Sequence, residues 1–267
     1  SALGGSIIEK SLRFRHGVNW NLQRTFSSNY STWTASLWFK RGRPGDYQYL
    51  FAFGGSGLAL NQSEGYLYIY NGSIINSTAR FRDHTGWYHV VMKQSTGTAY
   101  TYINGVLVHN GVSGFNVTSG QNCVIGRYPG DHEFDGYMAD IHLVCGQALD
   151  PTSFGYTDSQ TGIWRPKKYT GTYDNDEGFH LEFKDASSAS ALGTDTSGKG
   201  HNFSSSNFSV STNVWHMNNS GSAHSDSSTD SPTNNFCTLN PIDKDSNVSI
   251  LTEGNLRANT NTSNWCG

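Results

Sequence analysis

The sequence predicts an all-β protein, an antiparallel β-sandwich with an irregular C-terminal arm. Three observations lead to this fold class. Short runs of β-branched and aromatic residues are separated by turn residues about every eight to twelve positions. Apolar and polar residues alternate within several of these runs, and helical periodicity is almost absent. Only 35% of the residues are hydrophobic whereas 13% are aromatic, a balance typical of β-rich proteins with many loops.

The chain of 267 residues is long enough for one large β domain with an appendage. We expect residues 1–184 to form the sandwich. Residues 185–267 are rich in Ser, Asn, Gly and Thr, so we expect an extended arm that packs partly on the sandwich or on a neighbouring subunit. Isolated apolar residues would anchor this arm: Phe203, Phe208, Val210, Trp215, Phe236, Leu239, Ile250 and Leu251.

Alternation in two runs predicts which side chains face the core. In "TWTASLWFK" the predicted core residues are Trp33, Ala35, Leu37 and Phe39. The opposite face, expected to be mostly solvated, carries Thr34, Ser36, Trp38 and Lys40. In "YMADIHLV" the predicted inward residues are Tyr137, Ala139, Ile141 and Leu143, and the predicted outward residues are Met138, Asp140, His142 and Val144.

The stretch from Trp87 to Gly111 predicts a meander within a larger antiparallel sheet. A strand over residues 87–93 is followed by the turn "QSTGT" and by a returning strand over residues 99–103. The pair Asn104-Gly105 then favours a type I′ hairpin turn, because both residues tolerate positive φ.

Charge and hydropathy exclude two classes of partner. The formal net charge is −3 and the isoelectric point is near 6.3, so the chain lacks the basic surface that binds nucleic acid backbones. No run approaches the length of about eighteen apolar residues that a membrane span needs. We therefore expect neither nucleic acid nor a membrane as a partner.

The order of motifs resembles a known family. "TWTASLWFKRG", "GWYHVVMK", "YINGVLV", "CVIGRY" and "EFDGYMADIHLVCGQALDPTSF" together resemble the laminin-G-like, concanavalin-A-like jelly-roll domain. The continuation through "LGTDTSGKGHNF" is similar to the version of this domain found in virion structural proteins of tailed bacteriophages, often in tail fibres. The resemblance covers about Ser11 to Val210.

This resemblance implies a virion protein, assembled in the host cytoplasm, that contacts other virion proteins and forms a homo-oligomer, with trimers common among fibre relatives. The first expected function is a non-enzymatic, tail-fibre-type adhesin that contacts a host cell-surface glycan through loops at the sandwich rim. The alternative is a capsid-decorating or tail-capping structural protein anchored by its arm. A polysaccharide depolymerase is the third reading.

Candidate glycan-binding residues lie on two predicted loops. Aromatic rings stack on sugar rings, while acidic, amide and guanidinium groups bind sugar hydroxyls. "GDYQY" and "GRYPGDHEF" offer this mixture through Tyr47, Tyr49, Arg127, Tyr128, Asp131 and His132. The alternative is that these aromatics cover loop backbone or fill a subunit interface.

No cofactor is required by this reading, but calcium is a candidate because laminin-G-like domains often bind it near the rim. Oxygen ligands suited to Ca²⁺ occur in a first cluster of Asp131, Glu133 and Asp135, and in a second of Asp174, Asp176 and Glu177. The alternative is that both clusters are hydrogen-bonded turns. Asp135 could also accept backbone amides at its turn, and Gly136 would let its strand pass close to a neighbour.

Catalytic and redox chemistry have little support in the sequence. Glu177 and Glu182 are the candidates for the carboxylate pair of a glycosidase, but Glu177 lies in "YDNDEG", which indicates a solvated turn. His89, His109 and His142 are interpreted as half-exposed strand residues rather than metal ligands. The four cysteines are widely spaced, so we expect reduced thiols, with a disulfide between Cys123 and Cys145 as the alternative.

Overall fold

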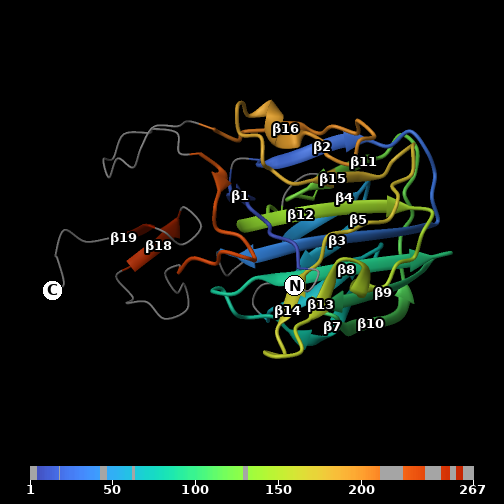
Figure 1. The fold of residues 1–267 in the computed structure, drawn as a ribbon, viewed down its shortest axis with the longest axis horizontal. Helices are drawn as coiled ribbons and strands as arrows, with labels where there is room; N and C mark the ends of the chain where they lie inside the picture. Colours follow the sequence, from blue (N-terminus) through green and yellow to red (C-terminus); the bar gives the residue numbers. More distant parts are fainter. Residues whose placement is uncertain are drawn as a thin grey trace.

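Two antiparallel sheets pack face to face, which confirms the predicted β-sandwich (Figure 1). The computed structural model describes residues 5–17, 19–42, 47–61, 64–128, 132–210 and 225–237, and the backbone of 248–252 and 257–260. Among these residues no helix has the length and the apolar surface that a membrane span requires.

The described strands form an eight-stranded and a seven-stranded sheet. The first runs in the order β10 (Val106–Ser113), β9 (Thr98–Ile103), β8 (Tyr88–Ser95), β3 (Thr32–Arg41), β12 (Gly136–Cys145), β1 (Ser11–Phe14) and β17 (Ser227–Ser228), and β15 (Phe179–Leu181) also pairs with β12. The second runs in the order β16 (Ser204–Ser206), β2 (Asn21–Thr25), β11 (Asn122–Ile125), β4 (Gln48–Phe53), β5 (Ser56–Leu60), β6 (Tyr66–Tyr70) and β7 (Ile74–Arg80).

Smaller elements complete the described fold. Two short hairpins are formed by β13 (Gly155–Thr157) with β14 (Trp164–Pro166), and by β18 (Val248–Thr252) with β19 (Arg257–Thr260). Two 3₁₀ turns are η1 (Pro151–Ser153) and η2 (Ser190–Gly193). The turn between β9 and β10 has positive φ at both Asn104 (49°) and Gly105 (79°), which confirms the predicted type I′ hairpin.

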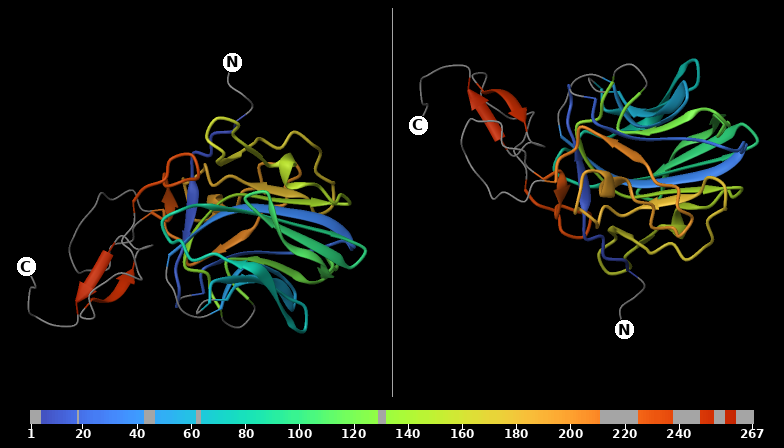
Figure 2. Two further views of the ribbon diagram at one scale, coloured as in Figure 1. Left: turned by 90° about the horizontal axis from the view of Figure 1, so that it is seen from below. Right: turned by 90° about the horizontal axis from the view of Figure 1, so that it is seen from above.

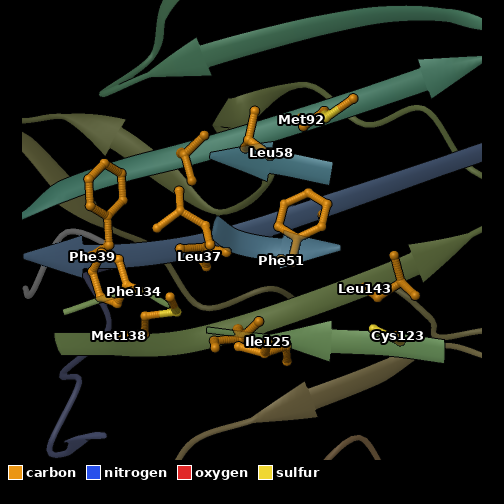
Figure 3. Packing of buried hydrophobic residues seen from close by; sticks show 14 of the residues in the cluster. Leu37, Phe39, Phe51, Leu58, Met92, Cys123, Ile125, Phe134, Met138 and Leu143 are labelled. Carbon is orange, nitrogen blue, oxygen red and sulfur yellow. The ribbon is translucent and has the colours of Figure 1, made fainter. Parts of the chain in front are cut away.

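The core lies between the two sheets and is built from side chains that alternate along their strands. Figure 3 shows Leu37, Phe39 and Met138 from the eight-stranded sheet facing Phe51 and Ile125 from the seven-stranded sheet. The predicted inner face of β3 is therefore confirmed. Each buried side chain of this size contributes about 1.5–3 kcal/mol to folding.

The prediction of a solvated outer face on β3 is wrong, because a further layer of chain covers it. Thr34, Ser36, Trp38 and Lys40 are all buried. Trp38 packs against Ile8 and the partly buried Trp164, and the Thr34 hydroxyl donates a hydrogen bond to the carbonyl oxygen of Gln147 (2.7 Å). Alternation shows that two faces exist, but it does not show what later segments cover one of them.

A β-bulge reverses part of the predicted facing of β12. The register against β3 shifts between Ala139 and His142, and Asp140 has a φ of 51°. Before the bulge Met138 enters the core, whereas Tyr137 and Ala139 point to the outer side, so the prediction is wrong there. After the bulge the prediction is confirmed: Ile141 and Leu143 face the core, and His142 and Val144 the outer side. A bulge changes which face each later residue occupies.

The described part of the C-terminal segment packs on the sandwich of the same chain. Phe203 and Phe208 join the main core, and β16 extends the seven-stranded sheet beside β2 (Figure 2). Asp226 forms ion pairs with Arg13 (3.1 Å) and Arg15 (2.9 Å). Trp215 and Leu239 lie outside the described residues, and the proposed boundary after residue 184 stays a prediction.

Candidate functional site

Six aromatic rings gather on the outer face of the seven-stranded sheet. We call this group the tyrosine cluster; its members are Tyr47, Tyr49, Tyr68, Tyr70, Tyr128 and His132. They come from β4, from β6, from the residue before β4, and from the segment that follows β11. Segments far apart in the sequence therefore contribute to one patch of surface.

Alternation along the strands creates this cluster. The core takes Leu67 and Ile69 of β6, so Tyr68 and Tyr70 point to the other face of the sheet. Small residues of the neighbouring β5 lie between the rings.

Two rows of side chains cross these strands. In the first row, Ala59 pairs with Tyr49 on one side and with Tyr68 on the other. In the second row, Gly57 pairs with Ala52 and Tyr70. A Cβ atom at Gly57 would lie 2.5 Å from the carbonyl oxygen of Phe51 and 2.9 Å from the Tyr49 ring, so glycine leaves room for both.

The rings contact one another in a continuous chain. Tyr49 is central: its ring centroid lies 4.7 Å from that of Tyr128, 5.9 Å from that of Tyr68 and 6.3 Å from that of His132. Tyr47 extends the cluster, with centroid distances of 5.5 Å to both Tyr68 and His132. Edge-to-face and stacked contacts at these distances fix the ring orientations before any ligand arrives.

Burial is graded across the cluster. Tyr49 and Tyr68 are buried, Tyr70 and Tyr128 are partly buried, and Tyr47 and His132 are exposed. Burial raises the pKa of both Tyr49 and Tyr68, so these hydroxyls stay protonated at neutral pH. The buried rings form a support on which the exposed rings are held.

The structure brings together four of the six residues predicted to contact a ligand: Tyr47, Tyr49, Tyr128 and His132. Arg127 precedes Tyr128 and is half-buried, and Asp131 lies outside the described residues. The loop-based prediction missed Tyr68 and Tyr70, although the strict alternation in "YLYIY" places these rings on one face.

In the first predicted calcium cluster, the carboxylates that the structure describes accept hydrogen bonds from backbone amides of a neighbouring loop. The buried carboxylate of Glu133 accepts hydrogen bonds from the backbone amides of Gly17 and Asn19. Asp135 accepts a long hydrogen bond from the backbone amide of His16 (3.4 Å), in line with its predicted role in the turn. Calcium at this cluster stays a prediction.

In the second acidic cluster, Asp174 and Glu177 hold loops together. Asp174 Oδ1 accepts hydrogen bonds from three successive backbone amides at residues 176–178, and its other oxygen accepts one from the amide of Cys145 (3.0 Å). Asp176 accepts a hydrogen bond from the Tyr30 hydroxyl (2.9 Å). Glu177 is fully buried, so the prediction of a solvated turn at this residue is wrong.

The second candidate acid, Glu182, forms an ion pair with Lys184 (2.8 Å). Burial would raise the pKa of this carboxyl, but the hydrogen bond from Lys184 and the nearby His180 hold it below the usual value. A glycosidase acid needs a raised pKa, so this environment does not prepare Glu182 for proton donation.

The three strand histidines are buried rather than half-exposed. His89 and His142 lie on the outer side of the eight-stranded sheet, where later segments carrying Trp164 and Phe154 cover the imidazoles. His109 instead pairs with Thr101 on the inner side, and its Nε2 lies 3.1 Å from the carbonyl oxygen of Ile75 on β7 of the other sheet. The predicted exposure is therefore wrong for all three.

A comparison with protein families gives the relationship of the chain. Residues 16–153 match the family model described as the concanavalin A-like lectin/glucanases superfamily, which is more than half of the chain. The chain belongs to the concanavalin A-like lectin/glucanase superfamily. Its fold is the jelly-roll sandwich of that superfamily, and none of the curated proteins compared with it matches.

Solved structures are similar to this chain only at low sequence identity and with TM-scores below 0.5. A native heptameric SAP-like pentraxin from Limulus polyphemus is 19% identical with a TM-score of 0.45, covering 66% of this chain and 93% of the pentraxin. Domain 4 of the extracellular arabinanase AbnA from Geobacillus stearothermophilus, solved with arabinotriose, is 20% identical with a TM-score of 0.39, covering 46% and 64%. Mouse laminin alpha1 domains LG4-5 are 13% identical with a TM-score of 0.40, covering 62% and 48%.

Proposed function

We propose that this chain is a non-enzymatic glycan-binding protein whose binding surface is the tyrosine cluster. The observation that carries the proposal is the contact network of six rings on one outer sheet face, with Tyr47 38% exposed at its edge. Membership of the lectin/glucanase superfamily supports it.

The chemistry of the cluster suits a sugar. The faces of pyranose and furanose rings carry C–H groups that pack on aromatic rings, while their hydroxyls need hydrogen-bond partners. Tyr47 and Tyr128 supply both a ring and a hydroxyl, and His132 supplies a ring nitrogen. The buried Tyr49 and Tyr68 keep this surface rigid, so a ligand loses less free energy in ordering it.

Binding without catalysis is the form of this proposal that the described residues favour. The ring network contains tyrosines and one histidine, and no carboxylate belongs to its described members. Glu177 binds loop amides and Arg24, and Glu182 is paired with Lys184. These pairings support binding rather than glycoside hydrolysis by the two predicted acids.

We further propose a setting in the virion of a tailed bacteriophage, as a tail-fibre-type adhesin. The motif resemblance over about Ser11 to Val210 motivates this setting. A single shallow site binds weakly, but a homo-oligomer with many copies on one particle converts weak binding into avidity. The described part of the arm packs on its own sandwich through Asp226 and Asp230, which favours an adhesin over a protein anchored by that segment.

The test is a glycan array probed with a multimeric form of the full chain, followed by calorimetry on the strongest ligand. We expect wild-type binding, and a loss of about tenfold or more in Tyr47→Ala and in Tyr128→Ala, because each variant removes one stacking ring. The matched control is Tyr102→Ala on β9, a partly buried tyrosine of the other sheet, which should bind like wild type.

Three results would overturn the proposal. Absence of binding by the multimeric wild type across host surface glycans would remove the function. Full affinity in Tyr47→Ala with loss in Tyr102→Ala would move the site to the other sheet. New reducing ends after incubation with host polysaccharide would show a depolymerase instead.

A further inference from the structure

Two histidines and an aspartate converge at the bulge of β12. Beyond the bulge, β15 replaces β1 as the neighbour of β12, and this pairing places His142 directly opposite His180. Their rings stack with centroids 4.0 Å apart. The Asp140 carboxylate lies between the two Nε2 atoms, 2.7 Å from that of His180 and 3.3 Å from that of His142.

The bulge is what makes this convergence possible. Asp140 and His142 are two residues apart on one strand, and the bulge turns the carboxylate of Asp140 toward the imidazoles. Among the residues that the structure describes, these three are the group of potential metal ligands whose donor atoms all lie within 4.8 Å of one another.

The distances fit one metal ion. Zinc binds imidazole nitrogen and carboxylate oxygen at about 2.0–2.2 Å, so tetrahedral ligand atoms lie about 3.3–3.5 Å apart. The separation of 3.3 Å between His142 Nε2 and Asp140 Oδ2 already matches this value. The separation of 2.7 Å between His180 Nε2 and Asp140 Oδ1 would need to open by about 0.6–0.8 Å. The two imidazoles now stack nearly parallel, at 13°. Because a metal ion lies in the plane of each imidazole that binds it, the His180 ring and the carboxyl group would rotate on binding, while Tyr173 holds the His142 ring.

Surrounding groups hold the ligands in place. The Nδ1 atom of His142 lies 2.6 Å from the Tyr173 hydroxyl, which leaves Nε2 as the nitrogen directed at Asp140. The backbone amide of His180 donates a hydrogen bond to Asp195 (2.9 Å). Metal-bound histidines commonly use their second ring nitrogen as His142 uses Nδ1 here, and such contacts raise metal affinity.

The three side chains line a cavity of about 350 Å³ on the outer side of the eight-stranded sheet. The side chains of Asp140 and His180 are 16% and 17% exposed, so an ion can reach them from this cavity. Its other walls include Glu9, Lys168, Tyr173 and Lys184. The cavity belongs to the opposite sheet from the tyrosine cluster and is a separate site.

We propose that Asp140, His142 and His180 bind one divalent transition-metal ion, with Zn²⁺ as the preferred ion. The two Nε2 atoms and one Asp140 oxygen are the protein ligands, and water from the cavity completes the coordination. Two imidazoles with one carboxylate suit zinc and its neighbours in the first transition series, whereas Ca²⁺ takes oxygen ligands. The site differs in position and in ion from the calcium clusters that the sequence suggests.

The experiment uses the full chain, expressed without a histidine tag, stripped with EDTA and dialysed. Calorimetry should show one Zn²⁺ per chain, and Co²⁺ should give visible absorption bands of a nitrogen- and oxygen-liganded ion. His180→Gln should weaken Zn²⁺ binding by about 100-fold or more, and Tyr173→Phe, which keeps all three ligands, by about tenfold. Millimolar Ca²⁺ should not displace the ion.

His132→Gln is the matched control, because His132 is exposed and lies in the tyrosine cluster; its affinity for Zn²⁺ should equal that of wild type. Absence of Zn²⁺ binding by wild type with an intact β-type circular dichroism spectrum would overturn the proposal and leave a metal-free hydrogen-bonded triad. Equal affinity in His180→Gln and wild type would also overturn it. If His180→Gln fails to fold, wild type and Tyr173→Phe decide the question.

Discussion

Glu177 is fully buried, and its carboxylate lies 2.7 Å from the guanidinium of Arg24. The same carboxylate accepts hydrogen bonds from the hydroxyl of Ser27 (2.7 Å) and from the backbone amides of Ser27 and Ser28. Glu177 therefore fastens the loop after β2 to the segment before β15, which are about 150 residues apart in the chain.

Replacing Glu177 with alanine should destabilise the fold by about 3–5 kcal/mol, because it leaves the Arg24 charge and two loop amides without their acceptor in a buried place. Urea unfolding followed by tryptophan fluorescence measures this change. Glu64→Ala is the matched control: Glu64 and Arg80 are 3.9 Å apart and both well exposed, so their loss should leave stability nearly unchanged. Similar losses in both variants would contradict the structural role of Glu177.

Gly136→Ala should also destabilise the sandwich. A Cβ atom at this position would lie 2.2 Å from the carbonyl oxygen of Lys40, and Gly136 has a φ of 144°. The strands β3 and β12 would have to separate, so we expect a loss of at least about 2 kcal/mol in the free energy of unfolding. Thermal and urea unfolding both report this loss.

Gly97→Ala separates the strain of a positive φ from the steric clash of the added Cβ atom. Gly97 also has a positive φ of 85°, but no described atom lies within 4 Å of its Cβ position. This variant should cost only the backbone strain, about 1 kcal/mol. If Gly97→Ala and Gly136→Ala lose the same stability, close strand contact is not what requires glycine at Gly136.

The inner face of β3 could be predicted from its sequence, whereas the outer face could not. Period-two alternation places Leu37 and Phe39 together, but it says nothing of the later segments that bury the other side. Lys40 shows this plainly: its ammonium binds Asp230 (2.9 Å) and the Phe236 carbonyl (2.7 Å), nearly two hundred residues later in the chain. Such a long-range partner leaves no local signal.

The two candidate sites also differ in how far the sequence predicts them. Loop composition pointed to Tyr47 and Tyr128, because exposed aromatics beside polar residues are a local pattern. The pairing of His142 with His180 depends on which strand follows β1 along the edge of β12, and on a bulge that no single residue predicts. A bulge shifts the inward-outward alternation of a strand by one residue. Alternation alone therefore does not show that His142 and His180 face each other.

The three cysteines that the structure describes should differ sharply in reactivity. Cys123 and Cys145 are free and buried in the core, and burial raises the pKa of both thiols. Cys237 is free and exposed. In the native protein an alkylating reagent should therefore modify Cys237 and spare Cys123 and Cys145, as peptide mapping by mass spectrometry would show. Labelling of all three in urea is the control, and rapid native labelling of Cys123 would contradict the described packing.

The stability of the fold should fall in acid, in part through His89. Its Nδ1 accepts a hydrogen bond from the indole N–H of Trp164 (2.9 Å), so Nε2 carries the proton and donates it to the Ser36 hydroxyl (2.8 Å). A second proton would face the indole N–H and remove this hydrogen bond. Burial lowers the pKa of His89 to about 3.

The sign of the pH dependence follows from the two states. In the unfolded chain a histidine has a pKa of about 6.5, so below that pH the unfolded state binds a proton that the folded state refuses. The contribution of His89 is therefore complete above pH 6.5 and is lost as the pH falls toward 3, by up to about 1.4 kcal/mol per pH unit. Urea unfolding of wild type and His89→Gln across pH 3–7.5 isolates this contribution to the free energy of unfolding. The wild-type curve should be steeper over that window, and parallel curves would mean that His89 accepts its second proton without cost in the folded protein.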